Sequence, residues 1–259
     1  MLIATWNVNS IRTRLSQIID WINKANPDIL CLQETKVMDD SFPIEPFEKL
    51  GYSVEVYGQK SYNGVAIISK IKPENVKKGF YGCTDFDQNI EIFLDQKRLI
   101  SADINGIKII NVYVPNSGQE LKRLDYRNIW DKDFLNYCID KCQTNKTIIT
   151  GDFNVAHNEI DIARPKPNYN KSAGYTQVEI DGFSNFLNNG FIDIYRVNNP
   201  DKVKYSWWNY RFKSRERNVG WRIDYFLVSE TMVDNIKNTD IENEYYGSDH
   251  CPVSIQLSF

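Results

Sequence analysis

The chain has 259 residues, of which 42% are hydrophobic and 25% charged, a composition typical of a soluble globular protein. With nine prolines and 13 glycines, it is neither collagen-like nor of low complexity. The 31 Lys and Arg against 34 Asp and Glu give a formal net charge of −3, so bulk charge does not indicate a nucleic-acid partner.

The sequence lacks signals that would direct the chain to a membrane or out of the cell. No apolar run approaches the roughly 20 residues of a membrane span, and the chain begins directly with the strand-like residues 2–6, without a targeting extension. The five cysteines are odd in number and lack zinc-site spacing, and Cys138 and Cys142, one helical turn apart, are expected to pack in the core. We therefore expect a reduced, cytoplasmic protein without a membrane partner.

The first half of the chain alternates a helical pattern with short apolar runs. Four apolar residues at i, i+3, i+4 and i+7 from Leu15 share one face of a helix that ends before Pro27. Asn105-Gly106 is a strong signal for a two-residue hairpin. Apolar runs predict strands at residues 29–32, 53–57, 65–69, 99–104, 107–114 and 147–150.

The second half predicts two helices and three more strands. One helix is expected over residues 120–142, and another follows the capping box at Thr176 and ends at Gly190. Strands are expected at residues 205–210, 222–228 and 253–257. Strands interspersed with helices indicate an α/β fold with two mixed β-sheets packed face to face and helices outside. No linker or repeat divides the sequence, so we expect one domain over residues 1–259.

Polar residues stand at the ends of six predicted strands, where an apolar run would ordinarily pass into a plain turn. A single Asp or Asn after a strand is usually a turn former, but six such positions indicate a site, because sites are built at strand ends. The residues are Asn7 and Asn9, Glu34, Tyr113 and Asn116, Asp152 and Asn154, Asp224, and Asp249 and His250.

These side chains predict oxygen-based metal chemistry. Carboxylate and amide oxygens suit Mg²⁺, or Mn²⁺ as a substitute, and the two histidines of the chain, His157 and His250, are too few for a multi-histidine zinc site. The sequence has no GxSxG elbow, Walker A loop or GxGxxG run. The remaining hypothesis is metal-assisted attack of water on a phosphoester, with a carboxylate as base and an imidazole as charge stabiliser.

Six motifs together carry a specific resemblance to a known protein family. They are TWNVNS (5–10), LQETK (32–36), NVYVPN (111–116), GDFNVAH (151–157), NVGWRIDYFLVS (218–229) and GSDHCP (247–252). In content and order they resemble the exonuclease III family of apurinic/apyrimidinic (AP) endonucleases, within the endonuclease/exonuclease/phosphatase superfamily. The resemblance implies a four-layer α/β sandwich and Mg²⁺-dependent incision of DNA 5′ to abasic sites that leaves a 3′-hydroxyl. It also implies 3′→5′ exonuclease and 3′-phosphodiesterase side activities.

The resemblance also implies a metal site in this sequence. Glu34 corresponds to the principal metal ligand, and Asn7 and Asp249 complete or border the metal shell. The full set of implied metal-site residues is Asn7, Glu34, Asp152, Asn154 and Asp249.

A catalytic set follows from the same resemblance. Asp152 corresponds to the base that orients and deprotonates the attacking water, and Asn154 positions this water. His250, held by Asp224, would bind the scissile phosphate and stabilise its growing charge. Tyr113 would assist the nucleophile or the leaving group.

A basic and aromatic segment, residues 205–222, is the candidate DNA-binding surface. Basic and aromatic residues mixed in this way suit phosphate neutralisation, stacking, or a cavity for a flipped nucleotide, whereas an edge strand blunted by charge is the alternative. The basic residues are Arg211, Lys213, Arg215, Arg217 and Arg222, interleaved with Trp207, Trp208, Tyr210, Phe212 and Trp221.

The resemblance favours the DNA-binding interpretation. It implies that Trp207, Trp221 and Ile223 form an apolar pocket for the baseless sugar, which excludes a normal nucleotide by size. The expected partner is double-stranded DNA with abasic or 3′-blocked lesions, and we expect a monomeric enzyme. Further expected DNA contacts are Arg12, Tyr62, Asn116, Asn168, Arg217 and Asn218.

Two alternatives remain open from the sequence. Another phosphoesterase of the superfamily, acting on a non-DNA substrate, would use a second histidine after residues 107–114, where this chain has Tyr113-Val-Pro-Asn116. A DNA-binding protein that has lost catalysis would not need so many carboxylates near phosphates. Three departures from the family pattern, none in the core chemistry, are Ser10, Gln119 and Ser172.

Overall fold

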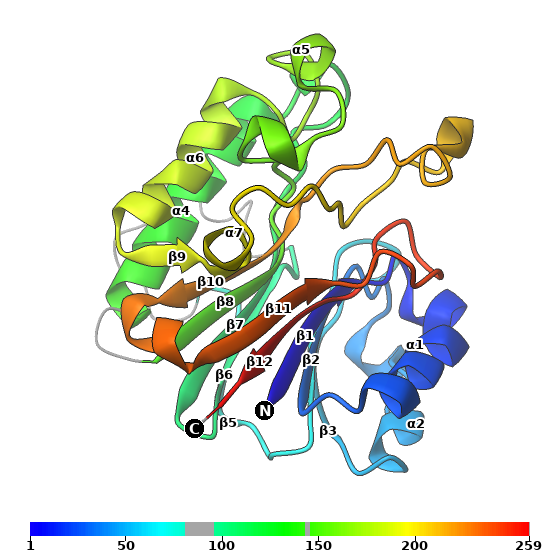
Figure 1. Cartoon of the computed structure of the whole chain (residues 1–259). Helices are drawn as coiled ribbons and strands as arrows, with labels where there is room; N and C mark the ends of the chain where they lie inside the picture. The colour runs from blue at the N-terminus through cyan, green and yellow to red at the C-terminus, as the bar shows by residue number, and fades with distance from the viewer. Residues whose placement is uncertain (81–95, 143–145, 259) are drawn as a thin grey trace.

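Two mixed six-stranded β-sheets lie face to face at the centre of the computed structural model, which describes residues 1–80, 96–142 and 146–258 (Figure 1). In spatial order the first sheet consists of β11 (Ile236–Ile241), β12 (Val253–Leu257), β1 (Leu2–Asn7), β2 (Ile29–Gln33), β4 (Val65–Ser69) and β3 (Ser53–Tyr57). The second consists of β5 (Glu74–Lys78), β6 (Leu99–Ile104), β7 (Ile107–Tyr113), β8 (Thr147–Asp152), β10 (Asp224–Ser229) and β9 (Phe191–Asp193). The predicted fold class is confirmed.

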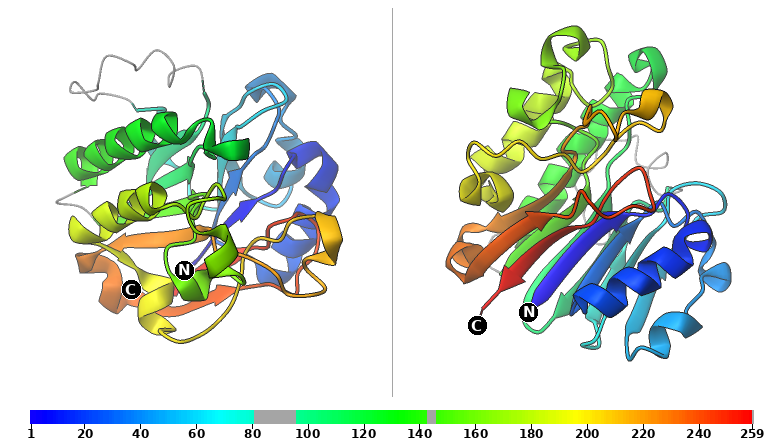
Figure 2. Two further views of the ribbon diagram at one scale, coloured as in Figure 1. Left: turned by 90° about the horizontal axis from the view of Figure 1, so that it is seen from above. Right: turned by 45° about the vertical axis from the view of Figure 1, so that its right-hand side comes forward.

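Helices cover the outer face of each sheet (Figures 1 and 2). Helices α1 (Ile11–Ala25) and α2 (Glu45–Glu48) lie on the first sheet, and α4 (Leu124–Cys142) and α6 (Gln177–Asn188) lie on the second. Shorter helices are α5 (Pro165–Asn168) and α7 (Ile194–Asn198), with 3₁₀ turns at Asp39–Ser41, Gln119–Leu121, Glu159–Asp161, Arg211–Lys213 and Glu230–Asn235. None of the helices in the described part of the chain combines the length and apolar character needed to cross a bilayer.

Alternation along the central strands divides their apolar side chains between layers. In β2, Ile29 and Cys31 belong to the core between the sheets, whereas Leu30 and Leu32 pack on the α1 side. Strands buried on both faces read as continuous apolar runs. This burial explains why the sequence revealed the central strands clearly.

The strand ends that carry the polar residues converge at one end of the sandwich. β1 and β2 are parallel and end together at Asn7 and Gln33, and β7 and β8 are parallel and end together at Tyr113 and Asp152. β10 runs antiparallel to β8 and begins at Asp224, directly opposite Asp152. Because both parallel pairs end on the same side, side chains from two sheets face one another there. The chain termini lie at the other end of the sandwich (Figure 1).

Local signals in the sequence are confirmed at several boundaries. Asn105 and Gly106 join β6 to β7 with positive φ angles of 52° and 74°. Thr176 caps α6 through a reciprocal capping box, and Gly190 follows the helix with φ 86°. Cys138 is buried in the core as expected, whereas Cys83 and the side chain of Cys142 lie outside the described residues.

Residues 205–210 are not the strand that their aromatic composition predicts. This segment crosses the ends of the sheets and makes isolated bridges between Trp207 and both Trp221 and His250. Trp207 lines a cavity, whereas Tyr205 and Trp208 pack in the core between the sheets.

Other boundaries also differ from the prediction. The strand predicted at residues 222–228 starts at Asp224 rather than Arg222. Helix α4 begins at Leu124 rather than at residue 120, because Glu120 and Leu121 adopt positive φ angles of 55° and 58°. Strands β5, β9 and β11 were not predicted. β5 and β11 carry mostly polar, partly exposed residues, and β9 has three residues, so none shows a clear apolar period.

Arg222 is buried, which corrects its expected place on a DNA-facing surface. Its side chain is 0% exposed and forms ion pairs with Asp161, with Nε 2.7 Å from Oδ1, and with Asp193, with Nη2 2.7 Å from Oδ2. The guanidinium therefore neutralises two carboxylates inside the protein and does not face DNA. Arg215 is also committed to the protein, since it donates to the carbonyl oxygens of Asn243 and Ser248 at 3.0 and 3.1 Å.

Replacing Arg222 by Met is expected to lower the free energy of unfolding by about 3–5 kcal/mol, because the buried Asp193 then loses the cation that pairs with it, and Asp161 keeps Arg196 but loses Arg222. Urea denaturation followed by circular dichroism measures this change. Lys49→Met, which breaks an exposed i,i+4 ion pair with Glu45, is the control and should cost under about 1 kcal/mol. Similar losses in the two variants would contradict the buried role of Arg222.

Candidate active site

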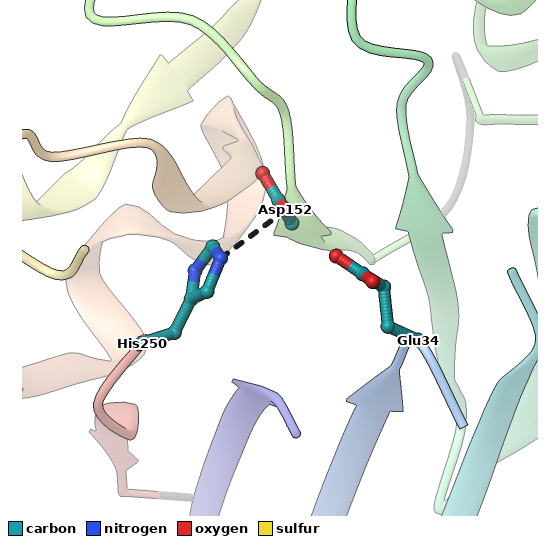
Figure 3. Close-up of side chains that lie close together, drawn as sticks. All are labelled: Glu34, Asp152 and His250. Carbon is teal, nitrogen blue, oxygen red and sulfur yellow. Dashed lines mark ion pairs between the residues drawn. The ribbon is translucent and has the colours of Figure 1, made fainter. Parts of the chain in front are cut away.

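Glu34, Asp152 and His250 meet at the convergent strand ends. One ligand atom from each lies within 4.8 Å of the other two (Figure 3). Glu34 follows β2 with φ 51°, Asp152 ends β8, and His250 precedes β12. The chain is able to place Asp152 so close to β7 because Gly151, with φ 140°, has no Cβ; an added Cβ would lie 1.9 Å from the Val112 carbonyl oxygen.

The side-chain amide of Asn7 joins the carboxylates of the two sheets. Its Nδ2 donates to Oε1 of Glu34 at 2.8 Å and to Oδ2 of Asp152 at 2.9 Å, while its Oδ1 accepts from the backbone N–H of Asn9. Asn7 therefore presents N–H groups to the carboxylates and holds them at a set separation. A direct ligand role, which the sequence suggested, would need the amide to turn its oxygen inward.

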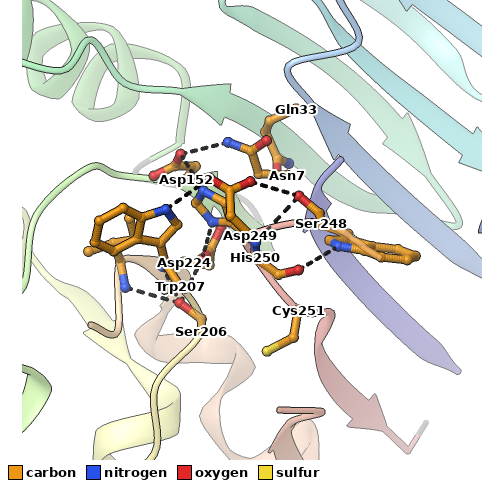
Figure 4. Close-up of polar contacts among 12 residues, drawn as sticks. Asn7, Gln33, Asp152, Ser206, Trp207, Asp224, Ser248, Asp249, His250 and Cys251 are labelled. Carbon is orange, nitrogen blue, oxygen red and sulfur yellow. Dashed lines mark hydrogen bonds and ion pairs between the residues drawn. The ribbon is translucent and has the colours of Figure 1, made fainter. Parts of the chain in front are cut away.

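His250 is held by a carboxylate on its far side (Figure 4). Its Nδ1 lies 2.9 Å from Oδ2 of Asp224, which also accepts a 2.6 Å hydrogen bond from Ser206. Its Nε2 is 3.8 Å from Oδ2 of Asp152. Burial lowers the pKa of His250, but attraction to Asp224, Asp152 and Asp249 outweighs it and raises this pKa to about 10.

Asp152 is poised to exchange a proton near neutral pH. Burial raises its pKa most, and repulsion from Asp224 and Glu34 adds to this, against the opposing charge of His250 and the hydrogen bond from Asn7. The resulting pKa is about 7. The backbone N–H of Asn154 donates to Oδ1 of Asp152 at 2.8 Å, so the carboxylate is oriented as well as buried.

Asp249 lies beside this cluster, with its oxygens already engaged. Oδ1 accepts from Asn9 at 3.0 Å and from Ser248 at 3.1 Å, and Oδ2 accepts from Nε1 of Trp207 at 3.1 Å (Figure 4). Burial raises the pKa of Asp249, but the charge of His250 and these hydrogen bonds outweigh it and lower the pKa below its ordinary value. The structure thus places Asp249 at the border of the carboxylate pair.

Tyr113, Asn116 and Asn154 line the opposite side of the cluster. Tyr113 makes a side-chain hydrogen bond with Glu34, and burial together with the charge of Glu34 raises its pKa well above the ordinary value. Nδ2 of Asn116 donates to Oδ1 of Asn154 at 3.0 Å, and Nδ2 of Asn154 donates to the Val114 carbonyl at 2.9 Å. These contacts bring the loops after β7 and β8 into one unit.

The cluster forms the floor of a cavity of about 620 Å³. Trp207 and Trp221 meet edge to face in its wall, with ring centroids 5.9 Å apart and an interplanar angle of 85°. The cavity is lined by polar, aromatic and basic side chains together, a combination typical of a ligand site. The expected DNA-contact residues in its lining are Asn116, Asn168, Trp207, Arg217, Trp221 and Ile223.

The structure does not bring every expected residue into the cavity. Arg12, Tyr62 and Asn218 are exposed on the surface outside its lining, whereas Asn7 and Asp224 are buried beneath its floor. His157 lies apart from this cluster, outside the cavity lining. Its Nε2 contacts Ser184 at 2.9 Å, and burial lowers its pKa.

Several residues of the site were missed by sequence reasoning. Lys36 pairs with Oε2 of Glu34 at 2.7 Å, and Ser206 holds Asp224. Arg164 lines the cavity. Lys36 lies within a quoted motif and Ser206 within the basic and aromatic segment, but a lysine or serine in such a position carries no signal of its own contacts.

Glu34 and Asp152 fit a divalent cation of the hard, oxygen-preferring type. They are two carboxylates from different sheets, and the repulsion of Glu34 contributes to the raised pKa of Asp152, which a cation would relieve. His250 lies within reach but does not suit ligation while it is protonated, because its ring nitrogens then have no free lone pair. The geometry therefore offers carboxylates to a cation and an imidazolium to an anion.

Comparisons with known proteins agree on one family. Residues 4–250 match the model of the endonuclease/exonuclease/phosphatase family. The chain is 39% identical over 264 residues to an exodeoxyribonuclease of Bacillus subtilis, with 100% of both chains covered. It is similar to the structure of an AP endonuclease from Archaeoglobus fulgidus, with a TM-score of 0.91, 34% identity and full coverage of both chains. A 3′ phosphatase from Neisseria bound to a product DNA hairpin is also similar, with a TM-score of 0.89, 33% identity and full coverage of both chains.

The imidazole of His250 is expected to titrate near pH 10 in the protein treated with EDTA, while that of His157 titrates below 6.5. Because the chain has two histidines, side-chain NMR resolves both. Asp224→Asn removes the strongest attraction on the imidazolium and should lower the His250 pKa by about one to three pH units, leaving His157 unchanged. Titration of both rings near pH 6.5 in the unsubstituted protein would contradict this geometry.

The same shift has a consequence for stability. A histidine whose pKa is raised from 6.5 to about 10 on folding stabilises the fold fully below pH 6.5, and this stabilisation is lost as the pH rises through 10. Asp224→Asn should reduce this dependence on pH.

Proposed function

The chain belongs to the endonuclease/exonuclease/phosphatase family, and from this premise we propose that it is a metal-dependent DNA repair nuclease that cuts the backbone 5′ to abasic sites. Attack by water on the phosphodiester leaves a 3′-hydroxyl. The observation that carries the proposal is the cluster of Glu34, Asp152 and His250 on the floor of a cavity with two tryptophans in its wall. The cluster supplies hydrolytic chemistry, and the wall supplies a place for the sugar.

Asp152 is the proposed base. Burial, which a bound cation does not remove, raises the pKa of Asp152 most, so this carboxylate takes a proton from water more readily than an ordinary aspartate. The backbone N–H of Asn154 and the amide of Asn7 fix its two oxygens, so its direction is set before substrate binds.

His250 is proposed to bind the scissile phosphate. Its raised pKa keeps the imidazole charged at neutral pH, and the hydrogen bond to Asp224 sets its orientation. A fixed cation facing the phosphate stabilises the negative charge that grows in the transition state. The proposed role of Tyr113, at the side of Glu34, is to assist the leaving group or the water.

Glu34 and Asp152 would hold the metal ion, with Asn7 behind them and Asn154 and Asp249 at the border. We propose Mg²⁺, for which Mn²⁺ can substitute, because the donors nearest the site are carboxylate oxygens. When bound, the ion supplies Lewis-acid activation of the phosphate.

Selectivity for abasic sites is proposed to come from the aromatic wall. Trp207, Trp221 and Ile223 line a space that accepts a sugar without its base and excludes a full nucleotide by size. Arg217 in the lining, and the exposed Arg12, would neutralise backbone phosphates without reading sequence. One chain contains the complete set, so we propose that a single copy is active.

Activity at 3′ ends is part of the proposal. The relatives include an exodeoxyribonuclease and a 3′ phosphatase bound to a DNA product. A 3′-terminal phosphate presents the same kind of phosphorus–oxygen bond to the cluster, without a base to be excluded.

The alternative of a non-DNA phosphoesterase is not favoured. The end of β7 offers Tyr113 and Asn116 where that mechanism needs a second histidine, and the His157 ring is occupied by Ser184 and Asn158. An inactive DNA binder is disfavoured by the intact arrangement of Asp152, His250 and Asp224.

A labelled duplex with one abasic-site analogue is expected to be nicked directly 5′ to the lesion in the presence of Mg²⁺, leaving a 3′-hydroxyl. The same reaction with EDTA, and an undamaged duplex of the same sequence, are the controls and should show little incision. Denaturing gel electrophoresis locates the cut. Absence of incision in both duplexes would overturn the proposal, and a DNA-binding titration would then separate an inactive binder from a phosphoesterase of another substrate.

Asp152→Asn is expected to lower kcat by roughly 10²–10⁴-fold, because it removes the base, while the Kd for abasic duplex stays within about threefold, because the DNA contacts remain. Single-turnover kinetics and a binding titration measure the two quantities. Asp103→Asn is the matched control, since Asp103 pairs with Lys108 on β6 and β7, away from the cavity lining. Parallel losses of affinity and turnover in Asp152→Asn would count against its assignment.

A further inference from the structure

A buried polar network lies behind the cavity, centred on Arg127 of α4 and Glu179 of α6. The two side chains are 2% and 0% exposed, and Nη1 of Arg127 is 3.9 Å from Oε1 of Glu179. We propose that Arg127 and Glu179 are positioning residues that set the width of the cavity and thereby its selectivity for a nucleotide without a base. This inference rests on the proposed function.

Arg127 holds the loops that follow β7 and β8. Its guanidinium donates to the carbonyl oxygens of Pro115 at 2.8 Å, Phe153 at 2.9 Å and Asn154 at 3.2 Å. Its Nε donates to Asp131 at 2.7 Å, which orients the guanidinium from within the same helix. One planar cation therefore fixes the backbone on both sides of the Asn116–Asn154 hydrogen bond.

Glu179 holds the loop after β7 and the loop before α6. Its carboxylate accepts from Oγ of Ser117 at 2.5 Å and from the backbone N–H of Gly174 at 2.9 Å. It also accepts from the N–H and Oγ1 of Thr176, at 3.1 and 2.8 Å. The capping box of α6 accounts for the Thr176 contacts alone, so the bonds to Ser117 and Gly174 are additional.

Gly174 connects the hydrogen bonds of Glu179 to the position of Trp221 in the cavity wall. A Cβ added to it would lie 3.2 Å from Cζ3 of Trp221 and 3.0 Å from the carbonyl oxygen of Asn154. The backbone at Gly174 is therefore wedged between Trp221, on the sugar side of the cavity, and Asn154, on the phosphate side. Because Glu179 holds Gly174 and Arg127 holds Asn154, the network determines how far apart the two sides lie.

The chemistry of the network suits this role better than stabilisation alone. A buried ion pair adds little net stability over apolar packing of the same volume. Apolar side chains, however, have no donors for the carbonyl oxygens of Phe153 and Asn154 and no acceptor for the N–H of Gly174. Charged groups hold backbone positions within tenths of an ångström, which a size-selective pocket requires.

The test uses Arg127→Lys, which keeps the charge but not the set of carbonyl contacts, Glu179→Gln, and the milder Ser117→Ala. Incision rates are measured on an abasic duplex and on an undamaged duplex of the same sequence. The ratio of kcat/KM for the two should fall by about tenfold or more in Glu179→Gln, since a small change in pocket size is worth roughly 10–200-fold in discrimination. Ser117→Ala should show a smaller fall.

Tyr52→Phe is the control for stability. It removes one buried hydrogen bond, from Tyr52 to the Pro27 carbonyl, far from the cavity lining, and should leave the ratio unchanged. If the three network variants fold and melt at lower temperature but keep the original ratio, the network is structural and the inference is wrong. Ser117→Ala loses a single hydrogen bond and keeps the test valid should the charged variants not fold.

A second readout separates this inference from the proposed function. Acrylamide quenching of Trp221 fluorescence, taken as the difference between each protein and the same protein with Trp221→Phe, should increase in the network variants and stay unchanged in Tyr52→Phe. If the unsubstituted protein cuts neither duplex but quenching increases in its network variants, the proposed function is wrong and the positioning role stands. Unchanged quenching and an unchanged ratio in an active enzyme would overturn the positioning role alone.

Discussion

The rest of the structure depends on holding like charges together in a buried site. Glu34 from one sheet and Asp152 from the other approach the same point, with Asp224 and Asp249 close behind, and each carboxylate repels the others. The Asn7 amide bridges the first two, and the His250 imidazolium faces the group. Such a cluster is costly to bury, and the raised pKa of Asp152 records this cost. In the proposed function, the same unbalanced charge attracts the cation and lets Asp152 exchange a proton.

A second constraint follows from the first, because the cluster sits on loops. Loops at strand ends have backbone groups without sheet partners, and these must be satisfied elsewhere. Arginines supply many of the missing donors. Arg127 serves the loops after β7 and β8, Arg215 serves the loop before His250, and Arg14 donates to the carbonyls of Asn9 and Gly247. The rigidity of the site thus comes largely from guanidinium groups that never face the cavity.

The sheet topology brings the side chains of the cluster together. Parallel pairs β1–β2 and β7–β8 end at the same side of the sandwich, and β10 begins there. Side chains from positions 7, 34, 152, 224 and 250 therefore meet although they are spread over most of the chain. The segment at 205–222 crosses above them and adds Trp207 and Trp221, so the proposed chemistry and the proposed selectivity come from different parts of the fold.

The sequence alone determined the fold class, the central strands and most of the polar side chains that meet at the strand ends. Apolar alternation and polar residues at strand ends are local patterns, and six motifs in one order carried the family resemblance. The sequence could not show that Arg222 is buried, that Arg215 is bonded to backbone carbonyls, that Asn7 presents its N–H groups, or that residues 205–210 do not form a strand. Each of these features depends on contacts with residues elsewhere in the chain, which lie up to 145 residues away for Asn7 and Asp152. A basic or aromatic residue has the same local pattern whether it faces DNA or a buried carboxylate, and only the packing of the two sheets and their loops decides which.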